Sequence, residues 1–225
     1  MNVKAWIEDI DQSLRLVSNA ELAEGMAAYM KGHFSYLGIK KPLRAEKTAT
    51  QIRSFEGSID DLFEAVFLLW ELEEREFQYV AMDLLERYKR LLKPEHLPHL
   101  KSLIVSKSWW DTVDKVSCNL VGFLIFKNPG LRGEVFLWGE EENLWLQRCS
   151  IIFQLTFKLN TDLDLLSAAI ERHVRSKEFF LQKAIGWSLR QYARTDAKWV
   201  FDYVERTHLA PLSKREALKH LLLRR

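Results

Sequence analysis

Residues 110–118 read WDTVDKVSC, and four other segments of the chain can be laid over this stretch in one register. They are FQYVAMDLL at 77–85, LQRCSIIFQ at 146–154, LQKAIGWSL at 181–189 and KREALKHLL at 214–222. Their starts are separated by 33, 36, 35 and 33 positions. A repeat of this length, built from helix pairs, is typical of an α-solenoid in which each pair buries its apolar face against its neighbours.

The rest of the chain supports an all-α fold. Residues of high helix propensity are abundant, and no segment alternates with the two-residue period of strands. The Trp, Leu-Gly and Tyr signature of tetratricopeptide repeats is missing, which favours degenerate HEAT-like units. No break in composition separates domains, so we expect a single domain over residues 1–225.

The expected helices follow one another with short connections. They span 3–17, 21–34, a basic stretch from Pro42 through Arg53, 58–72, 75–92, 94–106, 109–126, 129–139, 142–159, 161–173, 177–194, 196–206 and 212–223. The spacing of a capped helix start occurs at Ser58/Asp61, Ser108/Asp111, Thr161/Asp164 and Ser213/Glu216.

The composition limits the class of protein. With 48% hydrophobic and 28% charged residues, the 225-residue chain has a normal globular composition, and its net charge of +2 alone does not indicate a nucleic-acid binder. Cys118 and Cys149 lie in apolar helical patterns, as expected for buried thiols in a reducing compartment. We expect a cytoplasmic protein with no metal site, because ligand-spacing motifs, a signal peptide and a bilayer-length apolar run are all missing.

Asp114 is the first candidate functional residue. On a helix it shares a face with Trp110, four residues earlier, whereas Val113, Val116 and Leu120 form a core-directed face. The other repeat units have apolar or small residues at the position of Asp114, namely Ala81, Ser150, Ile185 and Leu218. Exceptions to a scaffold pattern are candidates for function.

Arg148 and Trp187 are further candidates. Arg148 lies among apolar residues, where a charge is costly unless it is paired or faces a polar concavity. Both a structural ion pair, possible with Asp114 itself, and a functional role remain open. Trp187 shares a helical face with Arg190 and Arg194, and such tryptophans are usually structural. Interleaved Arg and Trp on an inner curve would nevertheless suit a sugar-phosphate backbone.

Six segments together resemble the AlkD-type DNA alkylation repair proteins, the HEAT-like repeat DNA glycosylases. The segments are AAYMKGHFSYLGIKKP at 27–42, EREFQYVAMDLL at 74–85, SKSWWDTVD at 106–114, NLWLQRCSIIFQL at 143–155, SKEFFLQKAIGWSLRQYARTD at 176–196 and LAPLSKREALKH at 209–220. The resemblance implies a right-handed, C-shaped solenoid that binds duplex DNA. It also implies hydrolysis of the N-glycosidic bond of cationic N3- and N7-alkylated purines. We expect the protein to act as a monomer without a cofactor or metal.

The resemblance also assigns roles to residues. It makes Asp114 the catalytic aspartate, Trp110 and Trp187 the sugar-facing tryptophans, and Arg148 the active-site arginine. It places Tyr29 near the lesion and Arg190 towards the DNA backbone, and Lys31, Arg44 and Arg194 are additional candidates for DNA contacts.

One departure from the family pattern keeps other functions open. Where a close relative is expected to carry a DNA-facing lysine, this chain has Thr156, which puts DNA affinity in doubt. A non-catalytic relative that binds distorted or branched DNA is therefore one alternative. A protein-binding HEAT adaptor is another, since many helical solenoids bind proteins and the net charge is small.

Overall fold

The computed structural model describes residues 1–219, and all regular elements within this range are helices. The expected all-α class is therefore confirmed. The chain divides into two compact units, Met1–Leu92 and Lys93–Arg225, which are described separately below. The C-shape of the whole array and the single domain both stay predictions.

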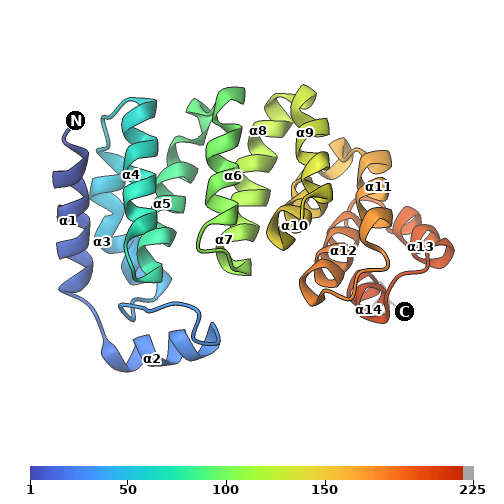
Figure 1. The fold of residues 1–225 in the computed structure, drawn as a ribbon, viewed down its shortest axis with the longest axis horizontal. Coiled ribbons are helices and arrows are strands. Elements are labelled where there is room, and N and C mark those ends of the chain that lie inside the picture. Colours follow the sequence, from blue (N-terminus) through green and yellow to red (C-terminus); the bar gives the residue numbers. More distant parts are fainter. Residues whose placement is uncertain (220–225) are drawn as a thin grey trace. The chain divides into compact units, whose positions relative to one another are not determined.

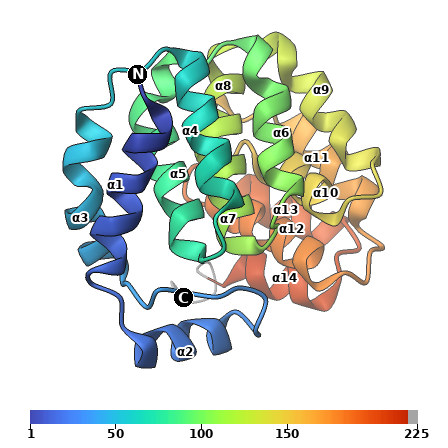
Figure 2. The same cartoon turned by 60° about the vertical axis from the view of Figure 1, so that its left-hand side comes forward.

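The first unit contains five α-helices. They are α1 (Val3–Arg15), α2 (Ala20–Tyr29), α3 (Lys41–Arg53), α4 (Ile59–Glu71) and α5 (Arg75–Tyr88), followed by the 3-10 helix η1 (Lys89–Leu91). Figures 1 and 2 show α1, α3, α4 and α5 side by side, with α2 lying across one end of them. Apolar side chains such as Ile10, Leu14, Leu69 and Leu84 fill the space between the four helices, whereas α2 buries none of its residues.

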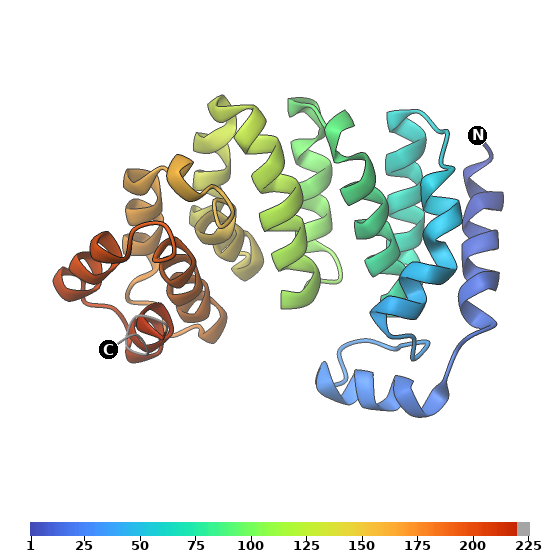
Figure 3. The ribbon, with the colours of Figure 1, turned by 180° about the vertical axis from the view of Figure 1, so that it is seen from behind.

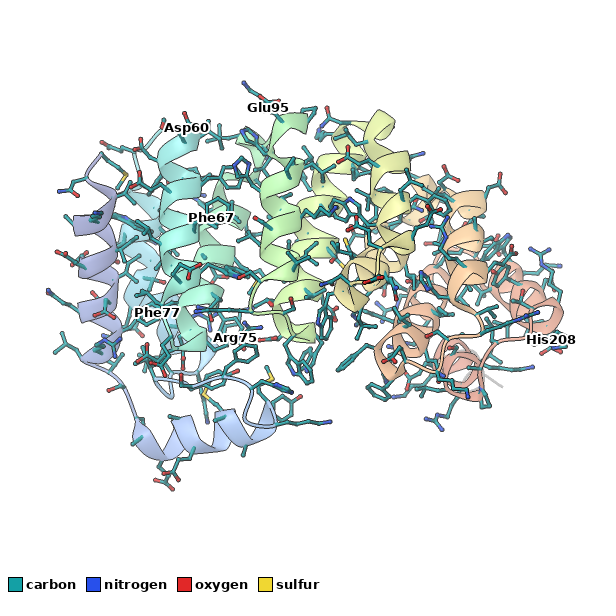
Figure 4. All side chains as sticks on the ribbon, viewed as in Figure 1. Asp60, Phe67, Arg75, Phe77, Glu95 and His208 are labelled. Atoms are coloured by element: carbon teal, nitrogen blue, oxygen red, sulfur yellow. The ribbon has the colours of Figure 1, made fainter. Side chains whose placement is uncertain are left out.

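A buried carboxylate fixes the segment that follows α2. Glu76 is fully buried at the start of α5, and its two oxygens accept the backbone N–H groups of Leu37, Gly38 and Ile39, each at 3.0 Å. Beside it lies Arg75 (Figure 4). Its guanidinium stacks 3.8 Å from the centroid of the Phe34 ring. Gly38 has a φ of 81°, a conformation that favours glycine. These contacts tie the C-terminal end of α2 to the core of the unit.

The second unit contains the remaining helices. The α-helices are α6 (Leu97–Val105), α7 (Trp110–Lys115), α8 (Gly122–Lys127), α9 (Arg132–Leu137), α10 (Leu144–Ile152), α11 (Leu163–His173), α12 (Phe179–Tyr192), α13 (Ala197–Arg206) and α14 (Pro211–Leu218). Short 3-10 helices lie at η2 (Pro94–His96), η4 (Pro129–Leu131), η5 (Trp138–Glu140) and η6 (Lys158–Asn160), and η3 (Val116–Val121) is a π-helix.

Helix α12 is central to the second unit. It packs most extensively against α14 and also against α10 (Figure 3). Its buried side chains join one hydrophobic cluster with residues of the neighbouring helices, including Ile152, Ile170, Leu181, Ile185, Val200 and Tyr203. All five repeat segments overlap α-helices, namely α5, α7, α10, α12 and α14. Residues 220–223 of the last expected helix and 220–222 of the last repeat segment lie outside the described residues.

Three of the four predicted capping sites are wrong. Ser58 and Asp61 form a capping box at α4, as expected. The N-cap of α7 is Trp109, because the Ser108 hydroxyl donates instead to the carbonyl of Ile104 at 2.6 Å. At α11 the cap is Asp162, one residue after the predicted Thr161. At α14 the cap is Ala210, and Ser213 donates to the carbonyl of Gln182 on α12.

The expected helix at 142–159 is also wrong in its second half. Helix α10 ends at Ile152, and the chain then turns. The buried amide of Gln154 accepts the backbone N–H of Asp162 at 2.8 Å and donates to its carbonyl at 3.2 Å. This tertiary anchor draws the chain out of the helical path, an outcome that local propensity does not predict.

Two further observations concern the described residues alone. No helix within residues 1–219 is both long enough and apolar enough to cross a bilayer. The same residues contain no cluster of three or more His, Cys, Asp or Glu side chains suited to hold a metal ion.

Candidate active site

Asp114 and Arg148 form a bidentate ion pair. The Nε atom of Arg148 lies 2.6 Å from Oδ1 of Asp114, and its Nη2 atom lies 2.8 Å from Oδ2. The third nitrogen, Nη1, donates to the backbone carbonyl of Phe180 at 2.5 Å. Arg148 therefore connects α7, α10 and α12. The ion pair that the sequence left open is present, and it fixes both oxygens of Asp114.

The helical segment that carries Asp114 has one face in the core and another at the site, as the sequence pattern predicts. Val113, Val116 and Leu120 are fully buried, whereas Trp110 and Asp114 are partly exposed. Directly after α7 the backbone continues as the π-helix η3. Such wide turns occur frequently at functional sites, because they change the direction of the side chains around them.

The surroundings of Asp114 disfavour its charge. Burial raises the pKa of this carboxyl group above its ordinary value, and the hydrogen bonds from Arg148 offset part of the increase. The side chain keeps 17% of its surface exposed, against 5% for Arg148. A carboxylate that is desolvated, oriented and still accessible is a typical feature of active sites.

Asp114 opens into a pocket of about 340 Å³. The pocket is lined by Trp110, Asp114, Arg148, Phe179, Phe180, Lys183, Trp187 and Arg190. The structure thus brings together the four residues expected to be catalytic and one expected DNA contact, Arg190. Two indole rings and a fixed carboxylate share one pocket, an arrangement that suits a ligand that is apolar on its faces and positively charged.

Two cations on α12 lie at the same pocket and share one carboxylate. Lys183 lies 3.0 Å from Oε1 of Glu216 on α14, and Nη1 of Arg190 contacts Oε2 of the same residue. Arg148 is neutralised by Asp114, so the pocket residues together with Glu216 carry a net charge of +1. A site of this charge can bind an anionic group such as a phosphate.

An aromatic cluster lies beside the pocket. Trp109 packs edge-on against Trp145 at 5.7 Å and Phe180 at 5.1 Å between ring centroids. Phe179 extends the cluster and is 55% exposed. Trp109 thus belongs to this cluster, and the adjacent Trp110 lines the pocket.

Several pocket residues were not predicted. Lys183 lies four residues before Trp187, so the helical spacing that linked Trp187 to Arg190 could have found it. Phe179 and Phe180 are the first two residues of the same helix and immediately precede the repeat segment 181–189. Glu216 lies on another helix and gives no local signal.

Three predicted DNA contacts lie in the first unit. Tyr29 is 73% exposed at the end of α2, and Lys31 is exposed with a φ of 58°. Arg44 is only 5% exposed, pairs with Asp83 at 3.3 Å and stacks 4.7 Å from the centroid of the Tyr79 ring. The Arg44 guanidinium is thus engaged by partners within its own unit, and its role as a DNA contact stays a prediction.

The remaining predicted residues lie away from the first pocket. Arg194 is exposed after the end of α12 and lines a second pocket of about 320 Å³, together with Lys158, Gln154 and Tyr192. Thr156 is exposed in the turn after α10. Arg190 and Arg194 were expected to share a helical face, but they line two different pockets.

Comparison with known proteins identifies the family. A family model described as DNA alkylation repair enzyme matches residues 10–221. A solved structure described as "Predicted DNA alkylation repair enzyme from Enterococcus faecalis" is similar with a TM-score of 0.86 and 35% sequence identity, over 91% of this chain and 96% of that chain. No curated protein matches. Because the family model and the structural likeness both span nearly the whole sequence, the resemblance seen in the sequence is confirmed, and the chain belongs to the family of DNA alkylation repair enzymes.

Proposed function

We propose that this protein is a monofunctional DNA glycosylase that removes cationic N3- and N7-alkylated purines, such as 3-methyladenine and 7-methylguanine, from duplex DNA. The observation that carries the proposal is the Asp114 carboxylate, held by Arg148 in the pocket that Trp110 and Trp187 line. The proposed reaction uses water and the protein's own side chains. We place it in the cytoplasm, with a monomer acting on chromosomal DNA.

The chemistry of the substrate explains why one carboxylate can suffice. Alkylation at N3 or N7 gives the purine a positive charge, so it leaves as a neutral base and needs little help from a general acid. The species that is costly to form is the deoxyribose, which becomes positively charged as the glycosidic bond breaks.

Asp114 is suited to stabilise that sugar. Fixed charges aimed at the place where charge develops in the transition state are usually the largest contribution to catalysis. Arg148 holds both oxygens of Asp114 in one orientation, so no reorganisation is needed as the sugar turns positive. The same carboxylate can orient the attacking water.

The aromatic and cationic residues have complementary roles in the proposal. The indole faces of Trp110 and Trp187 attract a cationic sugar by about 0.5–2 kcal/mol each. Arg190 and Lys183 line the same pocket, and in the proposal they bind the phosphates beside the sugar. Lys183 is paired with Glu216, so we give it a charge role and no part as a nucleophile, and we expect no strand cleavage.

Analysis of the products tests the reaction class. Duplex DNA treated with N-methylnitrosourea is incubated with the protein, and the free bases, abasic sites and strand breaks are measured. We expect free 7-methylguanine and 3-methyladenine with an equal number of abasic sites and intact strands. The variant Asp114→Asn should lose most of this release. Asp164→Asn is its matched control, because Asp164 is exposed in the first turn of α11, away from the pocket.

Each alternative gives a different result. Unmodified guanine recovered in the strand would indicate removal of the alkyl group in place of the base. Binding of branched DNA without base release would favour the non-catalytic relative. Failure to bind DNA at low salt would favour the protein-binding adaptor, because phosphate contacts are strongest there.

A further inference from the structure

Glu216 on α14 contacts two cations of the pocket, and the proposed reaction does not explain these contacts. Its side chain is 12% exposed and bridges two cations of α12 that line the pocket of Asp114. Lys183 binds one oxygen at 3.0 Å, and Arg190 binds the other and also donates to the backbone carbonyl of Glu216 at 3.3 Å. One acidic residue thus fixes the two cations at one edge of the pocket.

The backbone at Glu216 is itself held against α12. Gly186 lies on α12 between the two cations, and a Cβ atom there would lie 2.5 Å from the Cβ of Glu216 and 2.9 Å from the carbonyl oxygen of Ser213. The Ser213 hydroxyl donates to the carbonyl of Gln182 at 2.9 Å. Helix α14 therefore reaches α12 at the level of the two cations, which allows the short side chain of Glu216 to contact both.

The ion pairs leave part of each cation accessible. The Lys183 side chain is 37% exposed and that of Arg190 is 21% exposed. Within residues 1–219, Arg190 uses only Nη1 in hydrogen bonds, so Nε and Nη2 can contact a ligand. Lys183 keeps two further donors, since an ammonium group has three.

The charge of Glu216 is maintained by its partners. The hydrogen bond from Lys183, and then that from Arg190, hold the pKa of this carboxyl group below its ordinary value, against the opposing effect of burial. The carboxylate is thus ionised under the conditions in which DNA binding is measured, and the bridge to both cations is intact.

We propose that Glu216 is a positioning residue that holds Arg190 and Lys183 as a preformed clamp for a phosphate of the strand whose sugar faces Asp114. This proposal rests on the proposed function. A cation on a long side chain loses conformational freedom when it binds a phosphate, and a partner that fixes it beforehand reduces that loss. The clamp sets the position of the sugar relative to Asp114, so its effect falls on the rate of the reaction more than on DNA binding.

The test compares Glu216→Gln with Glu205→Gln. Glu205 is a matched control, because it forms a similar ion pair with Lys214 at 3.0 Å on exposed parts of α13 and α14, outside the pocket. Single-turnover release of 7-methylguanine from duplex DNA is measured at saturating protein. We expect about a 10-fold lower rate constant in Glu216→Gln, with the salt dependence of binding retained, and no change in Glu205→Gln.

A second pair of measurements shows whether Glu216 acts through Arg190. If it does, the rate loss in the double variant Glu216→Gln/Arg190→Gln is smaller than the two single losses combined, and the part that Glu216→Gln adds to Arg190→Gln is its effect through Lys183. Glu216→Asp keeps the charge and is expected to recover part of the rate. An unchanged rate of release in Glu216→Gln would overturn the proposal. If DNA binding were also tighter, Glu216 would be a carboxylate that competes with the phosphate for the two cations, and otherwise its role would be structural.

Binding separates this proposal from the proposed function. Each lost phosphate contact reduces the slope of log K against log salt by about 0.9. Lys183→Gln and Arg190→Gln should therefore each lower the slope, even for DNA from which no base is released. If the wild type releases no base, the glycosylase proposal fails while a lowered slope still supports the clamp. If base is released but neither variant changes the slope, the clamp alone is wrong.

Discussion

Replacing Arg148 with Gln should destabilise the protein because it leaves Asp114 without its partner. Arg148 is 4% exposed and donates hydrogen bonds to both oxygens of Asp114 and to the carbonyl of Phe180. Removing one member of a buried ion pair costs about 3–5 kcal/mol. Asp114 keeps 17% of its surface exposed and can gain some hydration, so we expect the lower end, about 3 kcal/mol. For a protein of this size the loss corresponds to a decrease in Tm of about 6–12 °C.

The same substitution should change the pH dependence of base release. Burial raises the pKa of Asp114, and Arg148 opposes this increase, so the pKa rises further in Arg148→Gln. The proposed reaction needs the ionised carboxylate, and activity is therefore lost as the pH falls through this pKa. The acidic limb of the pH–rate profile should move to higher pH in the variant.

Thermal unfolding followed by circular dichroism, together with single-turnover rates between pH 5 and 8, measures both effects. Arg132→Gln is the control, because Arg132 pairs with Asp162 at 3.3 Å and both side chains are partly exposed. Such a pair contributes less than about 1 kcal/mol. An unchanged Tm and an unmoved acidic limb in Arg148→Gln would refute the reasoning.

Three further predictions concern the scaffold. Gly186→Ala should cost about 1–3 kcal/mol, because the added Cβ would meet α14, whereas Gly133→Ala has open space and should be neutral or stabilising in thermal unfolding. Glu76→Ala should cost about 3 kcal/mol or more, since it leaves three buried N–H groups without their acceptor. An undiminished denaturation midpoint would contradict this. Burial raises the pKa of Cys149 to about 12 and that of Cys118 well above its ordinary value, so neither thiol should react with iodoacetamide at pH 8 until the protein unfolds. Rapid labelling of the native protein would contradict that burial.

The repeat in the sequence was enough to predict the fold class and the face of α7 that carries Asp114. The register placed Asp114 where other units have apolar or small residues, and the structure brings it to a pocket with Trp110, Arg148 and Trp187. Asp114 and Arg148 could be found because each is an exception to a local helical pattern, whereas the roles of Trp110 and Trp187 were expected from the resemblance to the family. The bidentate geometry of the Asp114–Arg148 pair could not be predicted, since it depends on contacts between separate helices.

The predictions that failed depended on local signals that tertiary contacts override. The hydroxyls of Ser108 and Ser213 have the spacing of caps, but both donate to nearby carbonyls. Glu216 was missed as a pocket neighbour because its partners lie 26 and 33 residues earlier in the chain.

The most direct test of the account is the rate of 7-methylguanine release by Asp114→Asn under single-turnover conditions. The uncharged Asn leaves the buried guanidinium of Arg148 without its charge partner, so Asp114→Asn should also lower the Tm. The rate is therefore measured at a temperature at which circular dichroism shows the variant to be folded. We expect a rate constant lower by about 100- to 1000-fold in the folded variant, with duplex binding largely retained, whereas an equal rate in the variant and the wild type would contradict the proposed role of Asp114.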